Sequence, residues 1–162
     1  MNGSTEHRAS DPGERPPGRS QAVLNLGSAR RMLPLVGRIV ADLLKQQRLV
    51  DQLGPEQDRL DRNRRSLHWP ERQRRYQVHE EFALAQRELT EARAELDVLG
   101  VALIDPLTGQ IGLPTVVNGR LAYFSWKPGE SGIQYWHFPG ETTRRTVPAS
   151  WSEAGLIAMK KP

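Results

Sequence analysis

The stretch VHEEFALAQRELTEARAELDVLG, residues 78–100, decides the fold. Apolar side chains recur in it at alternating steps of four and three residues: Val78, Phe82, Ala85, Leu89, Ala92, Leu96 and Leu99. This spacing is typical of a long amphipathic helix that packs along its length, as in a coiled coil. Gly100 follows the last apolar position and favours a C-terminal cap there.

A second apolar stripe precedes this helix, with one polar interruption at Gln47. Its members are Leu33, Val36, Val40, Leu43, Gln47, Val50 and Leu53. The stripe predicts a helix with Asn25 as its N-cap, a kink at Pro34, and a stop or bend at Gly54-Pro55. Residues 55–70 either extend this helix or form a loop. Because the two helices are of similar length, an antiparallel hairpin is the simplest arrangement.

After Gly100 the apolar period changes from 3.6 residues to 2, which indicates strands. We expect strands over 101–105, 110–117 and 133–138, with a turn over 106–109. Between the second strand and the next, Asn118-Gly119 predicts a two-residue type I′ turn, because both residue types tolerate positive φ. That turn sets the pairing of one apolar face: Val117 with Arg120, Thr115 with Ala122, Leu113 with Phe124, and Ile111 with Trp126.

The predicted fold class is α+β, a long antiparallel helical hairpin followed by a small antiparallel β-meander. Residues 1–20 are rich in Gly, Pro, Ser and charge, and are expected to be a disordered tail. The hairpin spans 21–100, and the sheet spans 101–148 and packs on the hairpin because so small a sheet is unstable alone. Residues 149–162 form a C-terminal tail in which Trp151, Leu156 and Ile157 are expected to be loosely tethered.

Composition excludes several classes of protein. The chain has 162 residues and no cysteine, so disulfides, a thiolate nucleophile and Cys-ligated zinc are excluded. Its longest uncharged apolar stretch, 98–104, is far shorter than the roughly 20 residues of a membrane span. His79-Glu80-Glu81 begins like a zinc-protease helix, but Ala83 stands where the second histidine belongs. We therefore expect a cytoplasmic protein that contacts no membrane and holds no metal or cofactor.

Charge is distributed unevenly along the chain. Residues 59–75 carry seven arginines against two acids, whereas 80–97 carry six acids against two arginines. The basic segment could bind the phosphates of a nucleic acid. The candidate residues are Arg62, Arg64, Arg65, Arg72, Arg74 and Arg75. Alternatively, the arginines solvate the end of the hairpin and pair with acids of the second helix, which is the commoner use of such a segment.

The best candidate for chemistry is Tyr135-Trp136-His137 on the last predicted strand. His137 could transfer protons near neutral pH, with Glu130 and Asp105 as its polar neighbours. Trp126, Trp136 and Arg145 could bind a ligand, Arg145 as an anion contact, and Arg144 could join the group. The alternative is that the aromatic residues belong to the core and that the charged ones form an ion-pair network.

A set of short motifs spans both halves of the chain. They are Ala29-x-x-Met32-Leu33-Pro34, Glu95-Leu96, Leu99-Gly100-Val101, Asp105-Pro106, Gly109, Pro114, Gly119, Tyr123, Trp126, Gly129-Glu130, Ile133 and Trp136-His137. In these residues the chain resembles a bacterial family of uncharacterised proteins called domain of unknown function 2203. The resemblance covers about residues 24–148 and its C-terminal half is the more specific. It implies a helical hairpin with a small sheet, and no established activity.

The chain departs from the family's pattern at polar positions. The family has an acidic residue and Phe where this chain has Gly112 and Leu113, and a Cys where it has Ser125. The predicted register places Gly112 directly opposite Ser125, so a site built there in the family would have lost both members. Ile104 replaces a Lys, and Phe138 replaces an acid. This depletion favours a non-enzymatic role for this chain.

Three functions follow, in order of preference. The first is a non-enzymatic interaction or scaffold protein that associates through the helices with a second copy or another protein. Its packing seam comprises Leu33, Val36, Val40, Leu43, Phe82, Leu89 and Leu96. The second is a small-ligand or catalytic site around His137, Glu130 and Asp105. The third is weak nucleic-acid binding through the arginines of 59–75.

Overall fold

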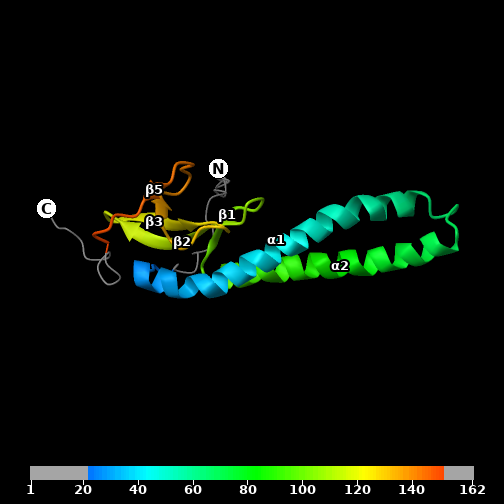
Figure 1. Cartoon of the computed structure of the whole chain (residues 1–162), viewed down its shortest axis with the longest axis horizontal. Helices are drawn as coiled ribbons and strands as arrows, with labels where there is room; N and C mark the ends of the chain where they lie inside the picture. The colour runs from blue at the N-terminus through cyan, green and yellow to red at the C-terminus, as the bar shows by residue number, and fades with distance from the viewer. Residues whose placement is uncertain (1–21, 152–162) are drawn as a thin grey trace, which may run out of the picture.

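The computed structural model describes residues 22–151. The described chain forms two helices followed by one antiparallel sheet (Figure 1). The elements are α1 (Leu26–Arg62), α2 (Trp69–Val98), β1 (Ala102–Asp105), β2 (Gln110–Val117), β3 (Arg120–Trp126), β4 (Tyr135–His137) and β5 (Arg145–Thr146). The predicted α+β fold, a helical hairpin followed by a meander, is confirmed. The predicted N-terminal tail lies outside the described residues.

Helix α1 begins as expected but ends later. The Oδ1 atom of Asn25 accepts a hydrogen bond from the Ser28 amide at 2.8 Å, which caps the first turn. Gly54-Pro55 does not stop the helix: of the two alternatives left open for residues 55–70, extension applies as far as Arg62, with Pro55 exposed on the helix surface. Burial of Leu53 and Leu60 against α2 extends the apolar stripe beyond the proline and stabilises the added turns. Figure 1 shows α1 bending along its length.

Helix α2 ends where the sequence predicts. Gly100 has a φ of 73°, a left-handed conformation that favours glycine. The amide of Val101 donates to the Leu96 carbonyl at 2.9 Å, closing the helix end. At its other end α2 starts directly after a short turn, with Pro70 in the first helical turn, where a missing amide hydrogen costs nothing.

The sheet has the strand order β1-β2-β3-β4-β5, with every neighbouring pair antiparallel. The predicted turn is confirmed, with φ of 51° at Asn118 and 74° at Gly119. The pairing of β2 with β3 follows the predicted register at all of its positions, including Gly112 opposite Ser125. Strand β4 is shorter than the expected 133–138, and the two-residue β5 was not predicted.

The apolar side chains form two separate cores. The proximal core joins the first half of α1 and the second half of α2 to one face of the sheet, and includes Val40, Leu96 and Phe124. The distal core contains only Leu53, Leu60, Leu67 and Val78, with Phe82 packed against it. We call residues 51–86 the arm. Figure 1 shows that this part of the hairpin extends beyond the sheet.

Trp151 corrects the expectation of a loosely tethered C-terminal stretch. Its ring packs against Trp136, with ring centroids 5.4 Å apart, and approaches Phe124 edge-on at 6.5 Å. Trp151 itself is held in place because it packs against the proximal core. Leu156 and Ile157 lie outside the described residues.

Candidate functional site

His137 lies in the interior of the sheet domain on β4, with 2% of its surface exposed. Its Nδ1 lies 2.8 Å from the Phe138 carbonyl oxygen, which can only accept, so Nδ1 is the donor. Its Nε2 is buried without a hydrogen-bond partner. The ring packs 5.7 Å from that of Tyr123, the residue paired with it on β3. His137 is therefore placed as a packed interior side chain.

Asp105 does not reach His137. It lies on β1, whereas His137 lies on β4, with two strands between them. Strands are spaced about 4.8 Å apart, so the two residues are separated by at least about 14 Å. The Asp105 carboxylate instead accepts hydrogen bonds from the Leu107 amide and the Thr108 hydroxyl. These bonds lower the pKa of Asp105 and assign it to the β1–β2 turn.

Glu130 forms an ion pair away from His137. Its Oε1 lies 2.7 Å from Nη1 of Arg144, and both side chains are mostly buried, with 12% and 17% exposed. The Lys127 amide donates to Oε2 of the same carboxylate at 3.1 Å. The Arg144 guanidinium lies 4.3 Å from the centre of the Tyr135 ring. The pair therefore ties the loop before β4 to the segment before β5.

The residues predicted to bind a ligand already contact other side chains or the backbone of the same chain. Arg145 makes a bidentate ion pair with Glu141, at 2.6 and 3.1 Å, and its guanidinium lies 4.9 Å from the centre of a Trp136 ring. This pairing lowers the pKa of Glu141, helped by a hydrogen bond from the Phe138 amide. Trp126 is buried, and its Nε1 donates to the Glu130 carbonyl at 3.1 Å. These side chains form the predicted alternative, core and ion pairs.

A neighbouring side chain fills the space beside Gly112. A Cβ atom on Gly112 would lie 2.8 Å from Cγ of Tyr123, closer than any relaxed contact. The Tyr123 ring therefore occupies the space that a side chain at 112 would need. Opposite Gly112, the buried Ser125 hydroxyl accepts a hydrogen bond from the Gln110 side chain at 3.1 Å.

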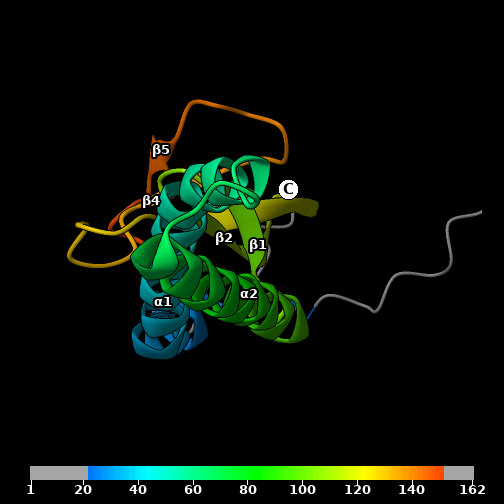
Figure 2. The ribbon, with the colours of Figure 1, turned by 90° about the vertical axis from the view of Figure 1, so that its right-hand side faces the viewer.

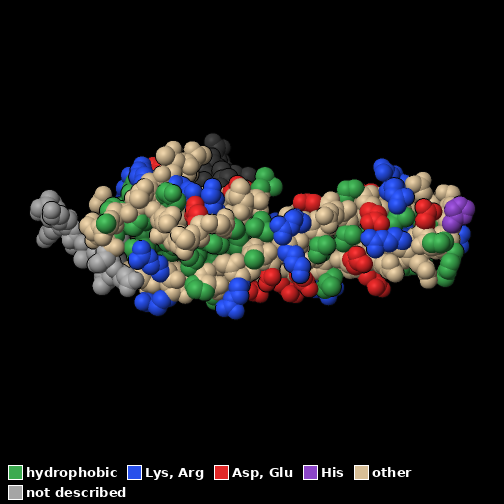
Figure 3. All heavy atoms as spheres, in the orientation of Figure 1, with side chains coloured by type: hydrophobic (Ala, Val, Ile, Leu, Met, Phe, Trp, Pro, Cys, Tyr) green, Lys and Arg blue, Asp and Glu red, His purple; other side chains and the backbone are tan. Residues whose placement is uncertain are grey.

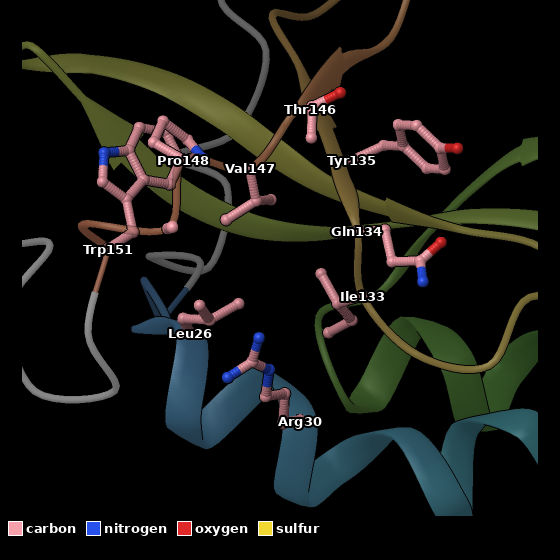
Figure 4. Close-up of a pocket in the computed structure, with 10 residues that line it drawn as sticks. Leu26, Arg30, Ile133, Gln134, Tyr135, Thr146, Val147, Pro148 and Trp151 are labelled. Carbon is pink, nitrogen blue, oxygen red and sulfur yellow. The ribbon is translucent and has the colours of Figure 1, made fainter.

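Two adjoining hollows lie between α1 and the β3–β5 region. The first has a volume of about 590 Å³, and Figure 4 shows Arg30 of α1 projecting toward it between Leu26 and Ile133. The second, of about 780 Å³, shares Arg30, Ile133 and Gln134 with the first and runs along α1 to Ala41. Neither hollow is lined by His137 or Asp105.

The arginines of the predicted nucleic-acid site divide into two groups. Arg74 pairs with Glu56 at 2.8 Å and Arg75 with Asp61 at 2.7 Å, so both cross the hairpin. These contacts lower the pKa of both acids, as does a hydrogen bond from His79 to Asp61. Arg72 donates to the Leu67 carbonyl at 3.0 Å.

The second group lies at the free end of the hairpin. Arg62, Arg64 and Arg65 are exposed and line a hollow of about 420 Å³ there. Within the described residues they form no ion pair. Figure 3 shows basic side chains around this end, mixed with acidic ones.

The residues of the predicted packing seam pack against other residues of the same chain. Five of its residues are buried in the proximal core: Val36, Val40, Leu43, Leu89 and Leu96. The other two, Leu33 and Phe82, are half-buried and pack against the proximal and distal cores. These side chains hold the two helices and the sheet together, so a partner would need another face of the hairpin.

Sequence reasoning overlooked the solvent face of α2. Four large apolar side chains are exposed there: Trp69 at 69%, Tyr76 at 68%, Leu84 at 49% and Val98 at 76%. At 3.6 residues per turn, these four positions fall within about 80° around the helix axis, so they share one face. We call these four residues the outer stripe. A second apolar period within α2 was the signal that could have identified it.

These observations define a class of protein, a helical hairpin joined to a five-stranded meander, with no catalytic group assembled from the predicted residues. The family model described as "Uncharacterized conserved protein (DUF2203)" matches residues 23–146. The chain belongs to this family. No curated protein and no solved structure matches the chain significantly.

Two further properties concern the described residues 22–151. None of their helices is long and apolar enough to cross a membrane. No three or more of their His, Asp and Glu side chains come together in a way that could hold a metal ion.

Proposed function

We propose that this protein is a non-enzymatic interaction or scaffold protein, which binds a protein partner through its helical hairpin. The observation that carries the proposal is the arm, which projects beyond the sheet and has a core of its own. The distal core shares no residue with the proximal core. The arm therefore contributes little to the packing of the sheet, and its length serves to present a surface.

The arm is a pair of helices packed against each other. Four buried apolar residues hold its helices together, and ion pairs from Arg74 to Glu56 and from Arg75 to Asp61 link α2 to α1. A preorganised helix face loses little conformational entropy when a partner binds. The exposed apolar residues of α2 supply the kind of contact that such a partner would use. The proposal places this protein in the cytoplasm.

A catalytic role receives less support from the geometry. Asp105 and Glu130 are bonded elsewhere, and His137 packs in the interior. A general acid or base must reach its substrate within hydrogen-bonding distance. A protein that only binds a partner does not need these three side chains to lie close together.

Site-specific photocrosslinking in the cells that produce this protein tests the proposal. The crosslinking amino acid is placed at Gln77 or Ala83, both exposed on α2, and at Thr142 in the exposed loop before β5 as a matched control. We expect protein adducts from the two arm positions and none from Thr142. Absence of arm adducts, or equal adducts from Thr142, would contradict the proposal.

Nucleic-acid binding is a second candidate, favoured by one observation. Arg62, Arg64 and Arg65 are exposed in the segment that precedes the exposed Trp69, and aromatic rings together with guanidinium groups suit stacked bases. Fluorescence anisotropy with a single-stranded oligonucleotide at low and high salt measures it. Phosphate contacts predict affinity that falls steeply as salt rises, and replacing the three arginines by glutamine should abolish it. No binding at low salt would eliminate this candidate.

A further inference from the structure

Helix α2 has apolar side chains on two opposite faces. The inner face carries Val78, Ala85, Leu89, Ala92 and Leu96, all buried against α1 or the sheet. The outer stripe runs from the first residue of α2 to the last, and its four side chains are between 49% and 76% exposed. The positions between them on the same face, such as Ala83, Arg87 and Ala94, are exposed as well. The outer face is therefore open along its whole length.

Charge changes sign along this helix. On the outer face, the exposed Arg72 lies near its start, and the exposed Glu91 and Glu95 lie near its end, whereas Arg74 and Arg75 are paired with acids of α1. Such a helix repels a parallel copy of itself, because like charges would then lie side by side. It attracts an antiparallel copy, because each basic end would meet an acidic end.

We infer that two copies of this chain associate through the outer stripe, with the α2 helices antiparallel across a twofold axis. This inference rests on the proposed function and names the partner as a second copy. A twofold axis uses the same patch on both chains, which is the commonest symmetry of homodimers. Only one patch is then needed, and the outer stripe supplies it.

The residue positions suit this symmetry. If Trp69 of one chain lies opposite Val98 of the other, the axis passes between residues 83 and 84 of both chains. Ala83 of each chain then meets Leu84 of the other near the axis. Glu80 and Arg87 are equally far from it on either side, so each Glu80 faces an Arg87 across the interface. Both are exposed and form no ion pair within the described chain.

The size of the face predicts how tightly the copies bind. A helix of 30 residues is about 45 Å long, and a helix face is about 10 Å wide. Two such faces bury on the order of 900 Å², which is at the low end for specific interfaces. We therefore expect a dimer that dissociates on dilution.

A charge exchange tests both the partner and the register. Glu80→Arg places two arginines against each other at each of these contacts, and Arg87→Glu places two glutamates there. Each variant alone should therefore dimerise about tenfold more weakly. Mixing the two variants restores opposite charges at both contacts, because one chain then carries arginine at positions 80 and 87 and the other carries glutamate at both. Analytical ultracentrifugation of the full-length proteins should therefore show a mixed dimer, and the double variant, which restores both contacts, should dimerise like the natural chain.

Two further variants separate the surface from the fold. Leu84→Glu on the stripe should weaken the dimer at least about tenfold. Gln86→Glu, exposed on the same helix but off the stripe, should leave it unchanged. Circular dichroism checks that both keep their helices.

The outcomes distinguish this inference from the proposed function. A monomer at all concentrations, or a double variant that does not recover dimerisation, would overturn the inference. If α2 crosslinks to another protein while the chain stays monomeric, the inference fails and the proposed function stands. If neither association occurs, both fail.

Discussion

The sheet end and the arm of this molecule are stabilised in different ways. Among the described residues, the proximal core contains 18 buried apolar residues, drawn from both helices and the sheet. The distal core of the arm contains four, and ion pairs across the hairpin supplement it. Burial of apolar surface is the larger and less condition-dependent source of stability, whereas partly exposed ion pairs contribute little and respond to salt and pH. The comparison teaches that most of the apolar burial lies at the sheet end, whereas the arm depends on a small core and on ion pairs.

The largest expected effect is the loss of a side chain from the proximal core. Phe124 is fully buried between the helices and Trp151. Phe124→Ala should lower the free energy of unfolding by about 3 to 5 kcal/mol. Urea denaturation followed by circular dichroism measures this. A loss below about 1 kcal/mol would contradict the assignment of this core as the centre of stability.

The same kind of substitution in the arm should act locally. Leu60 is fully buried in the distal core, and Leu60→Ala should destabilise the arm by about 3 kcal/mol. Hydrogen exchange should then speed up for amides of residues 51–86 and stay unchanged for β2 and β3. Equal acceleration in the sheet would show that the two regions unfold as one unit, and the comparison would fail.

Removing a mostly buried ion pair should have a smaller effect at the sheet end. Glu130→Gln leaves the Arg144 guanidinium, which is 17% exposed, without its carboxylate. We expect a loss of about 2 kcal/mol, because an uncompensated charge stays mostly buried. Denaturation of the double variant Glu130→Gln, Arg144→Gln is the control. The double variant should be more stable than Glu130→Gln alone. Equal stability of the two variants would contradict a stabilising role for the Glu130–Arg144 ion pair.

Acid should weaken the arm by the smallest amount. The pKa values of Glu56 and Asp61 are lowered from 4.5 and 3.8, chiefly by hydrogen bonds from Arg74 and from His79 and Arg75. A carboxyl group with a lowered pKa stabilises the fold above its unfolded pKa, and this contribution is lost as the pH falls through the folded value. Exchange protection of the arm should therefore fall below about pH 4. In Asp61→Asn this fall should be smaller, and an unchanged fall would contradict the role of Asp61.

Much of the fold could be predicted from the sequence, because local signals agree with the packing. The heptads of α2, the glycine at 100 and the Asn118-Gly119 turn each specify one conformation, and together they set the register of β2 and β3. The end of α1 could not be predicted, because the local signal of Gly54-Pro55 is outweighed by tertiary burial of Leu60. Strand β5 has two residues and depends on pairing with β4, so no periodicity indicates it.

The candidate site was harder to predict. Residue types suggested a group of His137, Glu130 and Asp105, but their distances depend on strand order and on bonds within loops. The outer stripe could be recognised from helical spacing alone. The stronger heptad pattern of the inner face lies in the same segment of sequence and obscures it. The exposure of its side chains distinguishes the outer stripe from the inner face. Figure 2 views the hairpin from its free end.

The central claim, that α2 pairs with α2 of a second copy in antiparallel register, is tested most directly by distances between spin labels. The chain has no cysteine, so single cysteines at Ala83 or Gln73 direct one label to each exposed site. At about 1.5 Å per residue, labels at 73 should be about 30 Å apart along the helices, whereas labels at 83 should be about 10 Å apart. Similar short distances at both sites would indicate parallel helices, and no inter-chain distance would indicate a monomer. Either result would contradict the account.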